Sequence, residues 1–230
     1  LRWYRQMVGI SSIGDTTVVT NKWMLGTRNS FIIGISATFL ATALGTVAAL
    51  GLSRRNMPFK GTIMAILISP MIVPLIITSA GMFFFYSKIG LTHTYLGLIL
   101  AHTALGTPFV VITVTATLTG FDTNLIRASQ SLGADTMRTF FKVIMPLILP
   151  GVISGALFAF ITSFDEVVVV MFIGSVEQIT IPKQMWAGLR QETSPVILCM
   201  ATCLVFLSIA LLTTVELLRR RSERLRGIKR

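Results

Sequence analysis

Five long stretches of the 230-residue chain contain no Asp, Glu, Lys or Arg, and they constrain the fold more than any other feature. They cover residues 29–53, 61–87, 89–121, 143–164 and 193–215. A helix needs about 20 apolar residues to cross the hydrocarbon core of a bilayer. The strands of a membrane barrel would be about ten residues long and alternating. We therefore predict an all-α, polytopic helical membrane protein with five transmembrane helices in this chain.

The composition supports a membrane protein. Hydrophobic residues make up 53% of the chain and charged residues only 13%, whereas a soluble domain averages about 25% charged. This excludes an ordinary soluble enzyme. The formal net charge of +11 does not predict a nucleic-acid partner, because the basic residues form no continuous polar face. We expect some of them to contact membrane lipid instead.

The positive charges predict the orientation, because cytoplasmic loops carry an excess of Lys and Arg. Three basic residues separate the first two stretches, three lie between the third and fourth, and seven follow the last. The loops on the opposite side hold only Lys88, Lys183 and Arg190. We predict a cytoplasmic basic tail over 219–230, with segment 1–28 and loop 172–193 outside. An external start implies a sixth span in the whole protein, ahead of residue 1.

Residues 120–146 form the longest predicted cytoplasmic segment between spans, and their pattern predicts a helix, a turn and a second helix. Residues 124–132 favour a helix, Gly133 interrupts it, and 134–144 resume it. Asp135 is placed to cap the second helix. Two short helices at the membrane surface would suit a soluble partner, although a plain connection between two spans is the alternative.

This segment resembles the coupling motif of permease subunits of ABC importers. That motif is Glu-Ala-Ala, three residues, Gly, and a hydrophobic–Pro ending about thirteen residues after the Gly. Here Arg127-Ala128-Ser129 precedes Gly133, and Met145-Pro146 follows at that spacing, with Arg127 in place of Glu. The resemblance implies a type I ABC importer permease fold. It also implies a contact with the ATPase made by Arg127, Ala128, Ser129, Gly133, Ala134 and Asp135.

Further matches resemble the polyamine (spermidine/putrescine) branch of these permeases, and they extend over nearly the whole chain. They are Trp3-Tyr4, Ser69-Pro70, residues 108–111 leading to 120–122, and residues 163–169. The resemblance implies a transmembrane subunit that forms the pathway for a small organic cation, most simply a polyamine. Met71 stands where the resemblance implies an Asp. An amino acid derivative, opine or aminophosphonate therefore remains the alternative substrate.

Asp165 and Glu166 are the sharpest candidates for a substrate pathway. An acid at the centre of a span costs about 2.5–3.5 kcal/mol, so acids in a span usually mark a pathway. We predict that the fourth helix continues through residues 167–170, with both acids near its outer end. Neighbouring residues differ by about 100° around a helix, so Asp165 is the first choice to face the lumen. Ser163 and Trp3 are predicted to join it, and the alternative is that both acids are ordinary helix-end charges.

Other chemistry receives weaker support. His102 lies inside the third span, where it could serve as a proton relay or ligand, but no acid accompanies it and a helix–helix hydrogen bond is favoured. A membrane enzyme using Asp165 and Glu166 would need carboxylates that converge in a wet pocket. A passive channel would not need a coupling motif. We predict no catalytic residue and no metal site in this chain.

The chain has no Gly-x-x-x-x-Gly-Lys-Ser/Thr phosphate loop. ATP and Mg are therefore expected on partner ATPase subunits, and no cofactor is expected in this chain. The resemblance implies two such subunits, a second and different permease subunit, and a periplasmic substrate-binding protein. It also implies one multi-pass permease domain over 1–230, located in a bacterial inner membrane.

Overall fold

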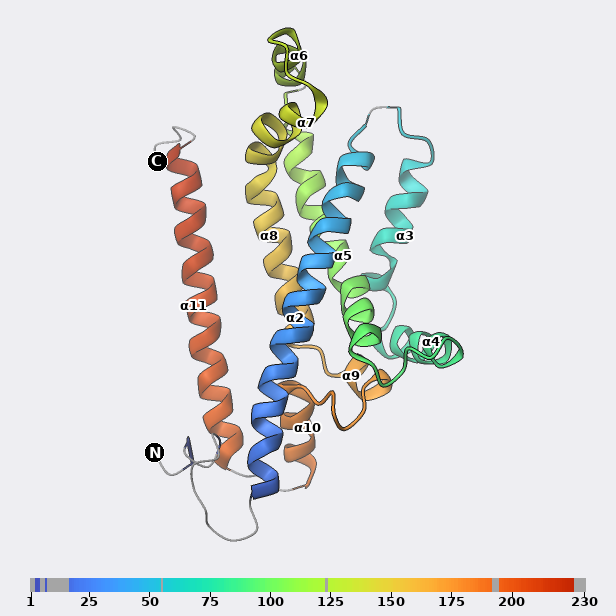
Figure 1. Ribbon diagram of the computed structural model, residues 1–230, viewed down its shortest axis with the longest axis vertical. Helices are drawn as coiled ribbons and strands as arrows, with labels where there is room; N and C mark the ends of the chain where they lie inside the picture. The colour runs from blue at the N-terminus through green and yellow to red at the C-terminus, as the bar shows by residue number, and fades with distance from the viewer. Residues whose placement is uncertain are drawn as a thin grey trace. The chain divides into compact units, whose positions relative to one another are not determined.

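The computed structural model is built of helices joined by turns in the part of the chain that it describes, namely residues 3, 4, 7, 17–54, 56–122, 124–191 and 195–225 (Figure 1). The longer helices are α2 (Thr17–Leu52), α5 (Tyr95–Thr119), α8 (Met145–Phe164) and α11 (Pro195–Leu225). The shorter ones are α3 (Lys60–Ile72), α4 (Leu75–Lys88), α6 (Asn124–Ser131), α7 (Thr136–Thr139), α9 (Val168–Ile173) and α10 (Ile181–Gln191). A π-helical turn, Phe140–Ile144, joins α7 to α8.

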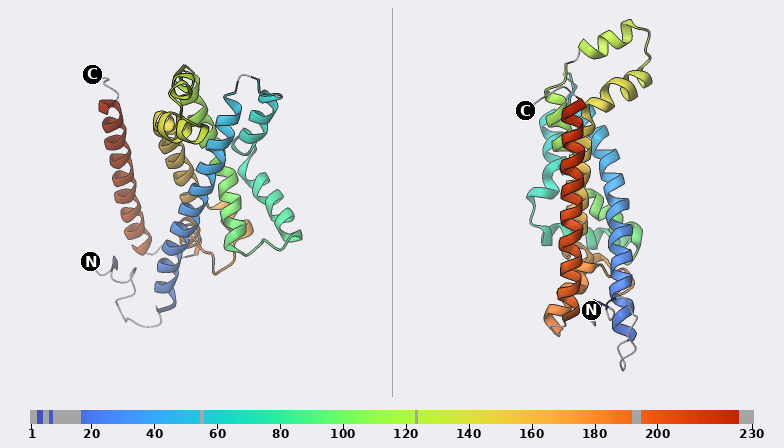
Figure 2. Two further views of the ribbon diagram at one scale, coloured as in Figure 1. Left: turned by 45° about the horizontal axis from the view of Figure 1, so that its top comes forward. Right: turned by 90° about the vertical axis from the view of Figure 1, so that its left-hand side faces the viewer.

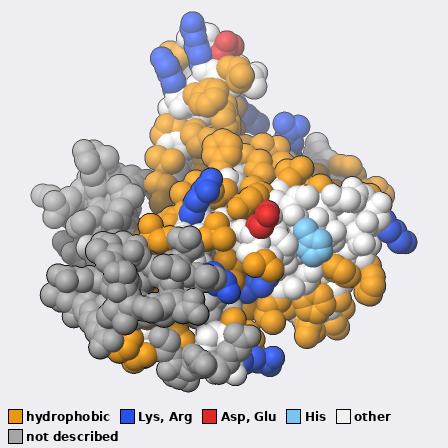
Figure 3. Space-filling model, turned by 60° about the horizontal axis from the view of Figure 1, so that its bottom comes forward, with side chains coloured by type: hydrophobic (Ala, Val, Ile, Leu, Met, Phe, Trp, Pro, Cys, Tyr) orange, Lys and Arg blue, Asp and Glu red, His pale blue; other side chains and the backbone are white. Residues whose placement is uncertain are grey.

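Within the described ranges, four helices are long and apolar enough to cross a membrane: Lys22–Leu52, Tyr95–Thr119, Thr136–Phe164 and Pro195–Thr213. The pair α3 and α4 makes a fifth span if it counts as one interrupted helix. Large apolar side chains such as Phe39, Ile72 and Leu198 remain more than two-thirds exposed. Hydrophobic side chains also predominate among the described residues in Figure 3. Such surfaces suit lipid, and the predicted all-α membrane fold is confirmed.

The second span is interrupted at Val73 and Pro74 for a local reason. The ring of a proline clashes with a helical conformation of the preceding residue. Val73 is accordingly extended, with φ −72° and ψ 135°, and Pro74 becomes the N-cap of α4. Pro70 remains inside α3. The break therefore follows from Pro74, and α3 and α4 are separate helices.

The chain divides into two compact units. One contains Leu1–Ser36, Pro74–His102 and Ser163–Arg230, and the other contains Ala37–Val73 and Thr103–Thr162. Helices α2, α5 and α8 each contribute residues to both units. The candidate substrate residues Ser163, Asp165 and Glu166 belong to the first unit, and the 120–146 segment belongs to the second.

The second unit is held by small and β-branched residues of α2, α5 and α8. Its buried core consists of Ala41, Ala49, Val110, Val114, Ile148 and Ala159. At Gly45 a Cβ atom would lie only 2.6 Å from Cβ of Val110, so only glycine permits this approach of α2 and α5. Close approach is the main source of packing energy between helices in lipid. Figures 1 and 2 show α6 and α7 beyond the ends of α5 and α8 in this unit.

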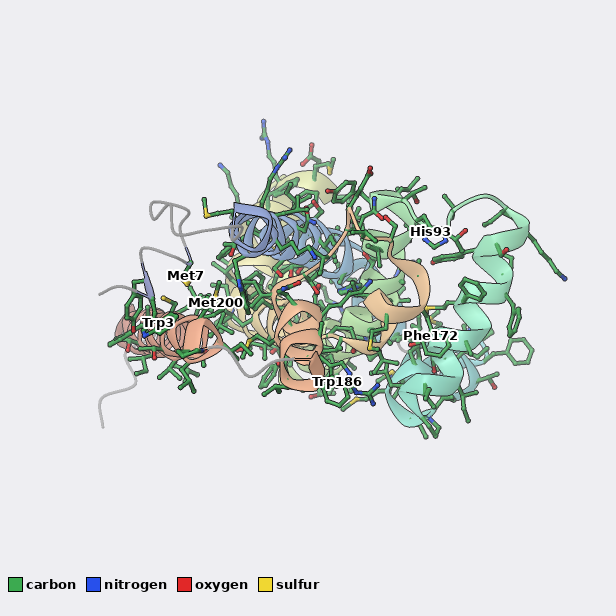
Figure 4. All side chains as sticks on the ribbon, turned by 90° about the horizontal axis from the view of Figure 1, so that it is seen from below. Trp3, Met7, His93, Phe172, Trp186 and Met200 are labelled. Atoms are coloured by element: carbon green, nitrogen blue, oxygen red, sulfur yellow. The ribbon has the colours of Figure 1, made fainter. Side chains whose placement is uncertain are left out.

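The first unit has a core around α10 and the start of α11, formed by Trp23, Ile181, Val196, Ile197 and Met200. Met7, labelled with Met200 in Figure 4, packs against this cluster.

Buried polar groups of α2 hold the segment between α9 and α10. The amide nitrogen of Asn29 donates to the backbone oxygens of Glu177 at 2.8 Å and Ile179 at 2.9 Å. The amide oxygen of Asn29 accepts from the hydroxyl of Tyr95 at 2.8 Å. Ser30 accepts from the backbone N–H of the first residue of α10 at 2.9 Å. These bonds fix the position from which α10 begins.

Candidate functional site

Asp165 and Glu166 lie in a break between two helices, since α8 ends at Phe164 and α9 begins at Val168. The prediction that the helix continues through 167–170 is therefore wrong. Glu166 explains the break, because its Oε1 accepts from the backbone N–H of Val169 at 2.9 Å. The first N–H groups of a helix have no acceptor within the helix. The carboxylate of Glu166 is the acceptor for one of them, the N–H of Val169.

The two acids have opposite surroundings. Asp165 is exposed, whereas Glu166 is only 7% exposed. Burial raises the pKa of Glu166, and the charge of neighbouring Asp165 adds to the increase, while hydrogen bonds from backbone N–H groups oppose it. Glu166, which precedes the N-cap Val167, thus satisfies an N–H in the first turn of α9, and Asp165 is the acid that remains accessible.

A cation satisfies the other end of α9. Lys183 of α10 donates from Nζ to the backbone oxygens of Val170 at 3.1 Å, Gly174 at 3.4 Å and Ser175 at 3.5 Å. Burial lowers the pKa of this ammonium group. A carboxylate at the N-terminus and an ammonium at the C-terminus both complement the helix dipole.

The side chains of α9 are themselves largely enclosed. Val169, Val170 and Ile173 are fully buried, and the helix packs against α4. The backbone oxygen of Ile173 accepts from the N–H of His93 at 2.8 Å, in the turn before α5. The short helix is therefore fixed at both ends and on its sides.

Ser163 is buried and forms a hydrogen bond with His102, with 2.8 Å between Oγ and Nδ1. The bond joins α5 to α8 and confirms the helix–helix hydrogen bond predicted for His102. Ser163 is thus bonded to His102. Its predicted part beside Asp165 in the substrate pathway stays a prediction.

Trp3 is 38% exposed. Figure 4 draws it beside the start of α11, well apart from Phe172 of α9. The part predicted for Trp3 beside Asp165 stays a prediction. Asn29 and Lys183, which the sequence did not single out, position this region.

The 120–146 segment has the predicted helix–turn–helix form. Helix α6 ends at Ser131, and Gly133 follows with φ +81°, a left-handed conformation that favours glycine. The side chain of Asp135 accepts from the N–H of Arg138 at 2.7 Å and caps α7. The second helix differs from expectation only in that it continues through the π-helical turn into α8, with Pro146 and Pro150 accommodated.

A buried pair of hydroxyl groups joins α6 to α7. Ser129 donates from Oγ to the backbone oxygen of Ile126 at 2.8 Å. A hydroxyl has only one proton to donate, so Thr139 supplies the proton of the 2.9 Å bond between the two side chains. Ser129 is thus an internal contact, and Ala134 is half-buried. The exposed members of the predicted contact set are Arg127, Ala128, Gly133 and Asp135.

Apolar spans interrupted by an exposed helix–Gly–helix define a class, the transmembrane subunits of binding-protein-dependent importers. The chain belongs to the family described as binding-protein-dependent transport system inner membrane component, which matches residues 41–225. The family resemblance and the type I ABC importer permease fold are confirmed. The chain is an inner-membrane, multi-pass permease subunit and not itself an enzyme.

Curated relatives are similar over most of their length. The spermidine/putrescine transport system permease protein PotC of Haemophilus influenzae is 30% identical over 195 residues, which are 85% of this chain and 76% of the relative. PotC of Escherichia coli K12 is 26% identical over 219 residues, 95% and 79% respectively. The putrescine permease PotI of the same strain is 28% identical over 186 residues, 76% and 65%.

A solved structure has the same fold. In the inward-facing MetNI methionine ABC transporter, one chain superimposes with a TM-score of 0.63 at 23% identity. The match covers 89% of this chain and 95% of that chain. At this identity the likeness shows the arrangement of the helices alone.

Proposed function

We propose that this chain forms, with a second permease subunit, the membrane pathway of an ATP-driven importer for a polyamine such as spermidine or putrescine. The similarity to permeases named for these two substrates, over three-quarters of their length, supports the substrate class. The structure adds an exposed carboxylate, Asp165, in the break after a span. This acid is the observation that carries the proposal.

Asp165 suits a cationic substrate for electrostatic reasons. It follows the C-terminal residue of α8, a helix of 20 residues. A cation that leaves water needs a compensating charge, and the attraction between ions grows as the local dielectric falls. Glu166 is already bound to backbone N–H groups, so Asp165 is the acid available to a polyamine ammonium.

The partners follow from the exposed ends of the chain. The exposed side chains around Gly133 would bind the ATPase subunits, two per complex, which hold ATP and Mg. An external binding protein would deliver substrate on the side of the 172–193 loop. The second permease subunit would be a different chain, so that the pathway lies in a heterodimer.

The enzyme alternative has no structural support. General acid–base catalysis by Asp165 and Glu166 would require the two carboxylates to converge on a common reactant. Instead one is exposed and the other accepts from the backbone of its own helix.

Uptake of radiolabelled putrescine and spermidine, normalised to inserted protein, tests the substrate assignment. Asp165→Asn keeps the size and removes the charge, and we expect uptake to fall by about tenfold or more, because hydrogen bonds to charged groups contribute about 1.5–3 kcal/mol. Glu177→Gln is the matched control, because it removes another exposed acid from the region after α8. Unchanged uptake in Asp165→Asn would refute the role of this acid, and transport of neutral or anionic compounds alone would refute the polyamine.

The basic tail supports a cytoplasmic C-terminus, since seven of the last twelve residues are Lys or Arg and such segments resist translocation. A C-terminal phosphatase fusion should be inactive and a C-terminal fluorescent protein should fold. Phosphatase activity at this terminus would reverse the topology and move the 120–146 segment away from any cytoplasmic ATPase.

A further inference from the structure

The charge on α6 is the feature of the 120–146 segment that its own fold does not explain. Arg127 lies in the first turn of α6, where the helix dipole favours a negative group. The residue is exposed, and it forms no ion pair within the described part of the chain. Arg127 therefore contributes nothing evident to the stability of α6, which points to a partner outside this chain.

The acids of the same segment are used locally. Asp122 accepts from the N–H of Asn124 at 2.9 Å, and Asp135 accepts from the N–H of Arg138 at 2.7 Å. Both carboxylates shape the ends of short helices. The side chain of Arg127 has no such local role.

The same segment also exposes large apolar side chains. Leu125 is 43% exposed, Leu132 is 88% exposed and Met137 of α7 is 66% exposed. Leu125, Ala128 and Leu132 follow one another at spacings of three and four residues, so they form one stripe. Arg127 is offset by about 100° from Ala128 and by about 140° from Leu132 around the helix, so it lies on another side of α6. A protein cleft that encloses α6 would therefore cover both the apolar stripe and the cation.

We propose that the ATPase cleft that receives α6 carries a carboxylate opposite Arg127, so that a subunit with a neutral or basic cleft is rejected. The inference rests on the proposed function of this segment. Covering Arg127 removes water from a permanently charged group, and an uncompensated charge at an interface is strongly unfavourable. A carboxylate matches the planar guanidinium with two parallel hydrogen bonds. Like charges placed opposite each other would discriminate against other ATPases.

The sign of a charge-reversal effect tests the proposal. The complete permease pair would be placed in phosphatidylcholine nanodiscs, so that no anionic lipid competes for the arginine. Binding of the purified ATPase would then be measured at several salt concentrations for wild type, Arg127→Gln and Arg127→Glu. We expect about two- to fivefold weaker binding for Arg127→Gln at low salt, with a smaller salt dependence than wild type. Arg127→Glu should be weaker still, by about tenfold or more.

Two controls separate the inference from the function on which it rests. Lys60→Glu reverses an exposed charge at the start of α3, outside the segment, and should bind as wild type does. Leu132→Ser removes the most exposed apolar side chain and should weaken binding without changing its salt dependence. Weaker binding by Leu132→Ser with Arg127→Glu equal to or tighter than Arg127→Gln would overturn the acidic cleft alone. Unchanged binding in all segment variants would overturn the docking role itself.

Discussion

An acid near the start of a helix accepts a backbone hydrogen bond in two regions of the molecule, one at the surface and one in the interior. Asp135 accepts from the N–H three residues ahead at 2.7 Å, and Glu166 accepts from the N–H three residues ahead at 2.9 Å. Asp135 is exposed and shapes the helix pair α6–α7, whereas Glu166 is buried and begins α9. Asp135 is the N-cap of α7 and Glu166 precedes the N-cap Val167 of α9, so a bond to the N–H three residues ahead occurs both at a surface and in an interior.

The surroundings decide what each region can do. Most side chains of α6 and α7 are exposed, so a second protein can reach them. In α9 three of six side chains are fully buried, and charged groups satisfy both helix ends. We expect changes in α6–α7 to impair coupling without unfolding the protein, and changes around α9 to act first on stability.

Gly133→Leu should have the largest effect. A residue other than glycine costs about 1–2 kcal/mol in the left-handed conformation seen at φ +81°, and the added bulk lies on the exposed turn. We expect substrate-stimulated ATP hydrolysis in the reconstituted complex to fall about tenfold or more, with normal insertion. Gly120→Leu is the matched control, because a Cβ there meets nothing within 4 Å and its φ is not positive. Full stimulated hydrolysis in Gly133→Leu would show that this turn does not couple.

Lys183→Met should reduce stability by an intermediate amount. The substitution keeps most of the aliphatic stem but removes the ammonium donor from the backbone oxygens of Val170 and Gly174. Within the described part of the chain, only the oxygen of Val170 also accepts from a backbone N–H, that of Gly174. An unsatisfied buried acceptor costs about 1–3 kcal/mol. Thermal unfolding in detergent, followed by circular dichroism, should show a lower melting temperature. Lys88→Met, at an exposed helix end, should melt as wild type does. Equal melting temperatures of the two variants would show that the hydrogen bonds of Lys183 do not stabilise the fold.

Glu166→Gln should have the smallest effect, below about 1 kcal/mol at neutral pH, because the amide oxygen can still accept from Val169. The variant is most informative through the pH dependence of its stability. Since burial raises the pKa of Glu166 above its ordinary 4.5, the folded state binds the proton more tightly than the unfolded state. Wild type should therefore lose stability as the pH rises from about 4.5 through the raised pKa, and the variant should lack this loss.

Melting temperatures of wild type and Glu166→Gln across that pH range provide the measurement. Asp135→Asn, which changes an exposed cap of the same geometry, tests whether the effect requires burial. Parallel pH curves for wild type and Glu166→Gln would show that Glu166 does not titrate in a buried setting.

The helix pair α6–α7 could be predicted because its signals are local. Gly133 and Asp135 act on backbone groups within a few residues, so their identity and spacing define the turn and the cap. The start of α9 could not be predicted in this way. The apolar, β-branched run after Glu166 is as compatible with a continued span as with a new helix, and burial of Glu166 depends on packing by distant segments.

The residues that hold α9 and α10 in place, Lys183 and Asn29, were still harder to predict from the sequence. Lys183 reaches carbonyl groups eight to thirteen residues away, and Asn29 binds backbone oxygens some 150 residues away. No local sequence pattern around either residue indicates which backbone oxygens it binds. Asn29 carried one usable hint, since it is a polar amide at the edge of an apolar stretch, where an unpaired group is costly.

The π-helical turn Phe140–Ile144 has a consequence for insertions and deletions. A π-helix closes its hydrogen bonds over five residues rather than four, so the turn holds one residue more than an α-helix would. Loss of a single codon within it would restore a regular helix. Because the wider turn takes up the extra residue, that deletion would leave α6 and α7 at nearly the same angle around the axis of α8, whereas one residue added to a regular helix would rotate them by about 100°. The turn thus allows this stretch to differ in length by one residue while the exposed face of α6 and α7 keeps its direction.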